Sequence, residues 1–296
     1  MNTMSTARDE GNRTKRPSRA SFAWMVAGAV VVGVIAGSTA AGPGPVPLLG
    51  AVLAVAVYWV VMRRLVHRST PEIAWQGAVG SVLSGIAVGL GFVLVSVGLI
   101  TAFGGYSFSW TGNGVWAVVW SAVVVQCAAA VTEELMFRGF VLQAVEQWWG
   151  SGVALAVTGV LFGAVHVMNP GATLWSAVAI AVEAGVMLGA AFVWRRSIWF
   201  VVGLHFAWNT AVQLLGIPVS GHSSEGLFAV ESHGAVALTG GAFGLEASIV
   251  PVVTGVLISV SMLVFAHRGG SLRARPVARS ASRVAAEARP GRGLSD

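Results

Sequence analysis

Charged residues are scarce in this sequence of 296 residues: Asp, Glu, Lys and Arg together make up only 10%. Soluble domains typically carry about a quarter charged residues, so the composition excludes an ordinary soluble protein. Hydrophobic residues make up 55% of the chain and the mean hydropathy is +0.77, which excludes disorder for most of its length. We therefore expect an integral membrane protein.

Cysteine is almost absent as well. The single cysteine, Cys127, excludes an internal disulfide and a cysteine-based zinc cluster. The H-E-x-x-H helix of soluble zinc proteases is also missing. The chain is rich instead in Trp (12) and Gly (38), as is typical of lipid-embedded helices, where Trp lies at the interfaces and Gly permits close helix contacts.

Eight apolar stretches are candidates for crossing about 30 Å of hydrocarbon, which takes about 20 residues each. They lie near Phe22–Ala41, Pro47–Met62, Gly77–Phe103, Gly114–Phe137, Val153–Val167, Leu174–Trp194, Ile198–Leu215 and Ala247–Ala266. The second and fifth are short, and the fourth is open beyond Phe137, because only Glu146 and Gln147 clearly break its apolar pattern. The sequence thus predicts an all-α, polytopic membrane domain over residues 21–268. The basic tails 1–20 and 269–296 are predicted to be disordered.

The positions of the basic residues predict the orientation. If the chain crosses the membrane eight times, all 18 Lys and Arg residues, Arg138 after the fourth span included, fall on one side. The positive-inside rule makes that side the cytoplasm, so we expect a multi-pass protein of the cell membrane with both termini cytoplasmic. The first span resembles a signal peptide, but its agreement with the other seven favours an uncleaved helix. The basic pI of about 10.9 then reflects topology and contact with membrane lipids, not nucleic-acid binding.

A few polar residues lie inside the predicted spans, where they are costly and usually functional. Glu134 and Arg138 are one helical turn apart and can pair, whereas Glu133 points about 100° away from Glu134. His166 follows an aromatic residue by one turn, and His205 precedes Asn209 by one turn. In each of these pairs, the two side chains therefore lie on the same face of their helix.

Three helices can present these groups at a similar depth. With a rise of about 1.5 Å per residue, His166 lies roughly 20 Å from the start of its span and His205 roughly 14 Å from Arg196. Glu133 lies roughly 18 Å from the inner end of its span if that span continues to about Val145. We therefore expect the carboxylate, the two imidazoles and the neighbouring amide to converge on one buried, water-accessible cavity.

Such a set of groups suits hydrolysis. A carboxylate in a low-dielectric pocket can serve as a general base acting on water. An imidazole can orient that water or bind a metal, and a His/Asn pair can donate hydrogen bonds to a developing oxyanion. One Glu with two His also fits a catalytic zinc site.

Three motifs follow one another on successive predicted membrane helices: EExxxR, FxxxH and HxxxN. They read Glu133-Glu134…Arg138, Phe162…His166 and His205…Asn209. In this order the motifs resemble those of the CPBP family of intramembrane proteases, which includes the CAAX prenyl endopeptidases and the bacterial Abi proteins. The resemblance covers roughly residues 77–217, about half of the chain.

The resemblance implies a role for each matching residue. Glu133 would activate water with His166, and His205 and Asn209 would stabilise the oxyanion. The second glutamate and the arginine of the first motif would orient the site. The family is often labelled as metalloproteases, yet its better-understood members are compatible with a metal-independent glutamate mechanism. We favour the mechanism without a cofactor, with zinc on Glu133, His166 and His205 as the alternative. The implied partner is a peptide or membrane-protein substrate that enters laterally or from the cytoplasm.

Simpler roles stay open for single residues. Glu134 and Arg138 could form an ion pair that only fixes helix register, and Asn209 could only join helices. Glu183 is either a partner of the site or one side of an interhelical hydrogen bond. We expect Cys127 to be a small buried hydrophobe rather than a nucleophile.

Two other classes of function also stay open. A proton-coupled transporter would need a polar path across the whole membrane, but the fifth and seventh spans have no ionisable group beyond His166 and His205. A non-catalytic or immunity-type membrane protein could retain the motifs. In the 218–246 loop, His222 and His233 are expected to form a solvated face with Glu225 and Glu231.

Overall fold

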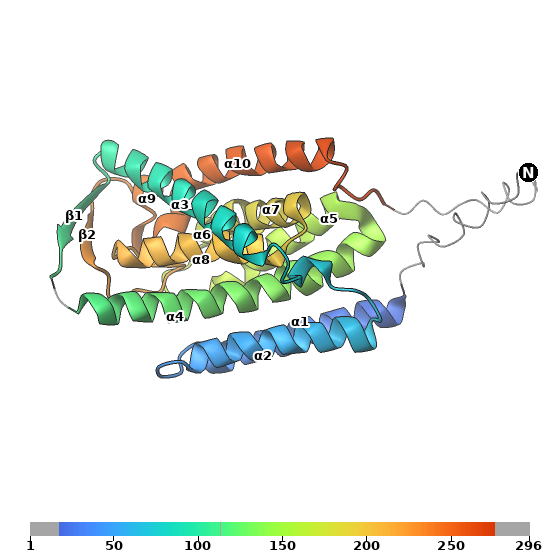
Figure 1. The fold of residues 1–296 in the computed structure, drawn as a ribbon. Helices are drawn as coiled ribbons and strands as arrows, with labels where there is room; N and C mark the ends of the chain where they lie inside the picture. Colours follow the sequence, from blue (N-terminus) through green and yellow to red (C-terminus); the bar gives the residue numbers. More distant parts are fainter. Residues whose placement is uncertain (1–17, 113, 276–296) are drawn as a thin grey trace, which may run out of the picture.

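The computed structural model describes residues 18–112 and 114–275. Its helices are α1 (Arg19–Thr39), α2 (Val46–Val60), α3 (Ala78–Ala102), α4 (Val115–Glu134), α5 (Leu142–Val165), α6 (Leu174–Ile180), α7 (Met187–Arg195), α8 (Ile198–Leu214), α9 (Val236–Thr239) and α10 (Ile249–Arg268) (Figure 1). Three π-helical segments extend α2 (Val61–Leu65), join α4 to α5 (Leu135–Val141) and join α6 to α7 (Ala181–Val186). The predicted all-α class is confirmed.

Among the described residues, six helical stretches are long and apolar enough to cross a membrane. One of them, the 54-residue stretch Val115–Met168, bends at Gly150, where Figure 1 shows the chain reversing direction. A further apolar helix, Ile198–Leu214, is shorter than these. With the two arms of the bent stretch counted separately and α8 included, apolar helices lie at all eight predicted places.

The bend at Gly150 settles where the fourth span ends. Gly150 has φ 80° and ψ 171°, a backbone conformation that favours glycine, and a Cβ there would meet the carbonyl oxygen of Arg273 at 2.8 Å. The helix therefore continues well past Phe137, through the π-helical segment, before it turns. Glu133 consequently lies deep along its arm, as the depth argument requires.

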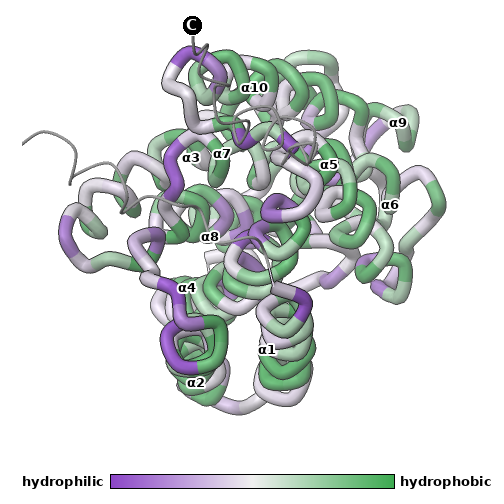
Figure 2. Tube along the Cα trace, turned by 90° about the vertical axis from the view of Figure 1, so that its right-hand side faces the viewer, coloured by the Kyte–Doolittle hydropathy of each residue, from purple (hydrophilic) through white to green (hydrophobic). Residues whose placement is uncertain are grey.

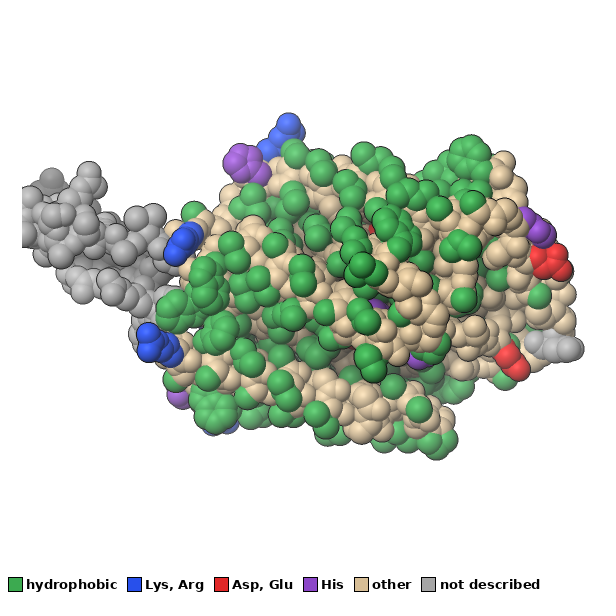
Figure 3. All heavy atoms as spheres, turned by 180° about the vertical axis from the view of Figure 1, so that it is seen from behind, with side chains coloured by type: hydrophobic (Ala, Val, Ile, Leu, Met, Phe, Trp, Pro, Cys, Tyr) green, Lys and Arg blue, Asp and Glu red, His purple; other side chains and the backbone are tan. Residues whose placement is uncertain are grey.

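The outer surface of the bundle is apolar. Large side chains such as Trp116 (84% exposed), Met168 (88%) and Leu174 (83%) have little protein around them. Figure 3 shows apolar side chains over most of one face, with exposed arginines toward one end and glutamates at the other. This pattern is the reverse of a water-soluble surface and fits a lipid-facing bundle.

Arg138 departs from the predicted distribution of basic residues. We expected it to follow the fourth span on the cytoplasmic side, but its side chain is 0% exposed and lies within the long helical stretch. It therefore belongs to the interior, where it pairs with a carboxylate. The orientation argument rests on the remaining basic residues.

Glycines bring α3 and α8 into close contact in the centre of the bundle. A Cβ on Gly85 would meet the carbonyl oxygen of Phe200 at 2.1 Å, and one on Gly203 would meet that of Val82 at 2.3 Å. Figure 2 shows α8 among the other helices, with the α1–α2 pair on one side of the bundle. Because α8 is held so tightly, the polar residues on its other face have fixed positions.

Two segments differ from the sequence-based expectation. Strands β1 (Tyr106–Trp110) and β2 (Phe228–Ser232) form a two-stranded antiparallel sheet, with Tyr106 opposite Ser232, where no strand was expected. Residues 269–275, predicted as the start of a disordered tail, lie against the bend, because Arg273 and Ser151 exchange hydrogen bonds of 2.9 Å. The rest of the two predicted tails, 1–17 and 276–296, lies outside the described residues.

Candidate active site

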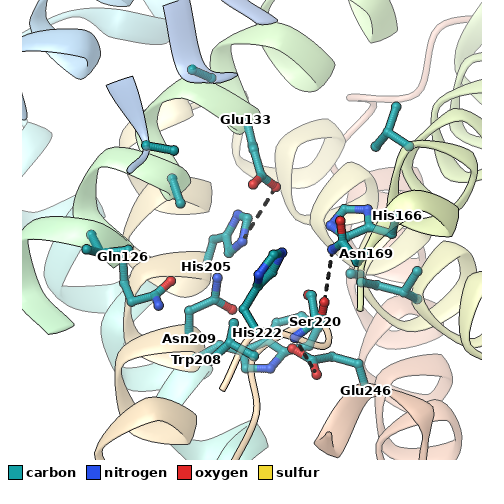
Figure 4. A pocket seen from close by; sticks show the side chains of 18 of the residues that line it. Gln126, Glu133, His166, Asn169, His205, Trp208, Asn209, Ser220, His222 and Glu246 are labelled. Carbon is teal, nitrogen blue, oxygen red and sulfur yellow. Dashed lines mark hydrogen bonds and ion pairs between the residues drawn. The ribbon is translucent and has the colours of Figure 1, made fainter. Parts of the chain in front are cut away.

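One cavity of about 560 Å³ opens among α1, α4, the end of α5, and α8. Four of its lining residues are those that the sequence predicts to converge: Glu133, His166, His205 and Asn209. Figure 4 shows their side chains around the same space. The structure thus brings the three motifs together, while the catalytic role of each residue stays a prediction.

Glu134 and Arg138 form a buried ion pair beside this cavity. Arg138 Nη1 lies 3.0 Å from Glu134 Oε1, and both side chains are 0% exposed. Arg138 Nη2 also donates to the carbonyl oxygens of Ala184 (2.9 Å) and Gly185 (3.0 Å). Both carbonyls belong to the π-helical segment that joins α6 to α7, a type of irregularity that is frequent at functional sites.

Glu134 in turn holds His205. His205 Nδ1 lies 2.8 Å from Glu134 Oε1, and because a carboxylate only accepts, this nitrogen carries the proton. The other ring nitrogen, Nε2, faces Glu133 Oε2 at 4.0 Å. The chain from Arg138 through Glu134 therefore fixes the orientation of the imidazole toward Glu133.

His166 is oriented by its own helix. Its Nδ1 donates to the carbonyl oxygen of Phe162 at 2.6 Å, so Nε2 is left for the cavity. The Phe162 ring lies 4.7 Å from the imidazole and 4.9 Å from the Arg138 guanidinium carbon. Phe162 is thus part of the cavity wall and lies between the ion pair and the second imidazole. Behind it, Gly163 lies close to the backbone of Ala177, because a Cβ on Gly163 would meet the Ala177 carbonyl oxygen at 2.3 Å.

The side chains of Asn209 and Glu133 make no hydrogen bond with the described residues around the site. Asn209 is 8% exposed and makes no hydrogen bond with any described residue, so the helix-joining role is not seen. The Glu133 side chain is 27% exposed and likewise accepts no hydrogen bond within the described part of the chain. Both groups are free to bind water or a substrate in the cavity.

The arrangement does not present a ready metal site. Among residues 18–112 and 114–275, no group of three or more His, Cys, Asp or Glu side chains is placed so that it could hold a metal ion. The alternative zinc set of Glu133, His166 and His205 would therefore need rearrangement.

The cavity also contains polar residues that the sequence reasoning missed. They are Gln126, Asn169, Gln213, Ser220, His222 and Glu246. Two of them carried a readable signal: Gln213 lies one turn beyond Asn209, and Gln126 lies about two turns before Glu133. The others reach the cavity because their loops fold inward, which helical spacing does not reveal.

His222 and Glu246 bring polar side chains from the 218–246 loop into the cavity, which corrects the expectation that His222 belongs to a solvated face. Both line the cavity at the end formed by the segment after α8 and the turn before α10. Glu246 Oε2 accepts a hydrogen bond from the backbone N–H of Ser220, and burial raises the pKa of Glu246 to about 7. His222 is therefore a cavity residue, whereas His233 and Glu231 are exposed as expected.

Two further residues lie away from the site. Glu183 is fully buried, but neither carboxylate oxygen has a hydrogen-bond partner among the described residues, so the interhelical bond, one of the two roles left open for it, is not seen. Cys127 is only half-buried and lines a separate apolar groove with Trp59 and Val131. The thiol does not face Glu133 across the cavity.

The fold and the cavity define a multi-pass helical membrane protein with a polar site inside the bundle. Residues 114–211 match the family model described as type II CAAX prenyl endopeptidase Rce1-like, so this third of the chain is similar to a family of proteases. The match contains all three motifs and confirms the resemblance. No curated protein and no solved structure matches the chain.

Proposed function

We propose that this protein is an intramembrane endopeptidase of the CPBP type, which hydrolyses a peptide bond in the cavity described above. The observation that supports this most strongly is Glu133, a carboxylate without a hydrogen-bond partner among the described residues. It faces the cavity beside two imidazoles whose Nδ1 atoms are already engaged. Such a carboxylate has its lone pairs available for a water molecule.

Hydrolysis then proceeds by general base catalysis. Glu133 takes a proton from water while Nε2 of His166 accepts a hydrogen bond from its other proton, so that the oxygen attacks the carbonyl carbon of the substrate. The tetrahedral intermediate collapses as the carbon–nitrogen bond breaks. The leaving nitrogen receives the proton held by Glu133.

His205 and Asn209 stabilise the oxyanion in this scheme. Asn209 donates from its amide, and His205 donates from Nε2 when both ring nitrogens carry protons. With His205 as an imidazolium, the charges of Glu133, Glu134, Arg138 and His205 sum to zero, which lowers the cost of burying them in a membrane. Proton transfer to Glu133 and formation of the oxyanion preserve that balance.

We propose that no metal takes part. The donor geometry described above favours a free carboxylate over a ligand. Purified protein should retain its activity after chelator treatment and dialysis, with metal content well below one per chain. Stoichiometric zinc, with activity lost on its removal and restored by its return, would overturn this and make Glu133, His166 and His205 ligands.

We place the protein in the cell membrane with its basic end and both termini in the cytoplasm. The exposed arginines at one end of the bundle support this orientation through the positive-inside rule. The substrate is a peptide or membrane protein that reaches the cavity laterally or from the cytoplasm. Reporter fusions after Ser69 and Arg196 should read as cytoplasmic, and one after Ser224 as external.

Cleavage of a quenched peptide by the purified protein in detergent tests the proposed activity. Wild type should cleave, and Glu133→Gln, His166→Ala and His205→Ala should lose activity while remaining folded. A folded wild type that cleaves no peptide of a broad library would favour a non-catalytic protein. Proton flux in proteoliposomes that Glu133→Gln abolishes would instead favour the transporter alternative.

A further inference from the structure

The cavity extends beyond the proposed catalytic residues toward the loop end of α8. Along this helix, His205, Asn209 and Gln213 are successive at intervals of one turn, and all three line the cavity. Gln126 lines it from α4, about two turns before Glu133. Two polar stripes therefore run side by side for about 10 Å past the site.

The two glutamines meet across the gap between α4 and α8. Gln126 Nε2 donates to Gln213 Oε1 at 2.8 Å, and the residues are 6% and 3% exposed. This single bond leaves the carbonyl oxygen of Gln126 and the amino group of Gln213 without a partner among the described residues. If the oxygen and nitrogen atoms of both side-chain amides are exchanged, the pair still leaves one acceptor and one donor without a partner.

A free acceptor beside a free donor can hydrogen-bond with the N–H and C=O groups of an extended peptide. A substrate must be unwound before Glu133 can reach its scissile carbonyl, and a backbone group left without a partner in apolar surroundings is costly. The α1 side of the cavity offers no polar side chain, because its lining residues are Gly33 and Ala36 in the helix and Ala40 and Ala41 just after it. The glutamine pair therefore offers polar side chains to the cavity from α4 and α8.

We propose that Gln126 and Gln213 form a substrate-positioning subsite that hydrogen-bonds the backbone of an extended peptide arm on one side of the scissile bond. This inference rests on the proposed function. Gln213 lies eight residues from His205, or roughly 12 Å along the helix. An extended chain advances about 3.3 Å per residue, so the subsite takes the third or fourth residue from the cut.

The test measures how cleavage depends on substrate length. Peptides with one to six residues on either side of a fixed scissile bond are compared by kcat/KM. Wild type should gain about tenfold, mainly through KM, when the third or fourth residue is added on one side only. In Gln213→Leu and Gln126→Leu the ratio of long to short peptide should fall to near one. This ratio is measured within each variant, so loss of folded protein does not affect it.

A second substrate separates backbone pairing from side-chain packing. Replacing the amide of that third or fourth residue by an ester removes a backbone N–H, and should reduce the gain in wild type but not in Gln213→Leu. The matched control is Ser96→Ala, which breaks another polar contact between helices, Ser96 Oγ to Thr254 Oγ1 at 3.0 Å, away from the cavity. It should keep the wild-type length dependence.

Two results would overturn the subsite. One is an undiminished gain in both glutamine variants, and the other is a wild type that cleaves short and long peptides equally well. Either leaves the proposed protease activity intact. Failure of wild type to cleave any peptide would instead contradict the proposed function itself.

Discussion

The buried carboxylates of Glu146 and Glu134 both pair with arginines, and their surroundings differ sharply. Glu146, near the bend of the long helical stretch, receives both terminal nitrogens of Arg196 at 2.7 and 2.8 Å. Arg273 and Ser151 add further bonds, so both of its oxygens are engaged. Glu134, beside the cavity, uses one oxygen for both Arg138 and His205, and its other oxygen has no partner among the described residues.

This difference indicates that the ion cluster around Glu146 stabilises the fold, whereas the cluster around Glu134 belongs to the candidate active site. Glu146 joins the bend at Gly150 to Arg196 and to the segment after α10, and its saturated oxygens have little capacity for new bonds. The inner cluster ends instead in Glu133, whose carboxylate is partly exposed to the cavity. Unused hydrogen-bonding capacity in an apolar interior is costly, and a site that must bind water and a substrate needs it.

The variant Glu133→Gln is expected to have the largest effect and tests whether the inner cluster carries the chemistry. The change keeps the shape of the side chain but removes the base, so cleavage should fall by about 10²–10⁴-fold. Glu133 makes no hydrogen bond with the described residues. The unfolding temperature of the Glu133→Gln protein in detergent should therefore stay near that of wild type. Near-normal cleavage by this variant would remove Glu133 from the mechanism.

Glu246 extends the comparison to a third carboxyl group, with a pKa raised by burial from about 4.5 to about 7. Between these pH values the folded protein holds a proton that the unfolded chain has released, so stability should fall as pH rises through this window. The loss is about 3 kcal/mol in total. Unfolding temperatures from pH 4.5 to 7.5 should show this decline, and Glu246→Gln should flatten it. Parallel curves would contradict the assignment.

Glu146→Gln should have the opposite signature to Glu133→Gln. It weakens the charged hydrogen bonds to Arg196 and Arg273, and we expect a stability loss of about 1–3 kcal/mol after allowing for the partial exposure of both arginines. The rate of cleavage per folded molecule should be retained. Intrinsic tryptophan fluorescence during heating measures the loss of stability. A selective loss of rate without a loss of stability would show that the two clusters are not separate.

The smallest effect is expected for Cys127→Ser. The thiol lines a groove along α2, outside the site cavity, so both cleavage and stability should stay within about twofold and about 0.5 kcal/mol of wild type. Steady-state assays and thermal unfolding on the same preparation measure both. An inactive Cys127→Ser beside an active Glu133→Gln would point to a thiol nucleophile.

The sequence predicted the inner cluster well, for a physical reason. Each motif lies within one helical turn, so spacing alone places Glu134 with Arg138, and His205 with Asn209. Apolar span lengths then bring the helices to a common depth. A reversal between the fourth and fifth spans was predicted, but its place at Gly150 was not, because that depends on contact with a segment more than 100 residues away. Glu246 was missed for a similar reason, since loop packing rather than helical periodicity brings it to the cavity.

Hydrolysis in ¹⁸O-labelled water tests the central claim most directly, namely that Glu133 activates water for attack on a peptide bond. Mass spectrometry of the products from purified wild type should find one labelled oxygen in the new carboxyl terminus, after a single turnover and without added metal. Glu133→Gln, equally folded, should form this product at least about 100-fold more slowly. Labelled product at the wild-type rate from Glu133→Gln would contradict the account, as would the absence of any cleavage by wild type.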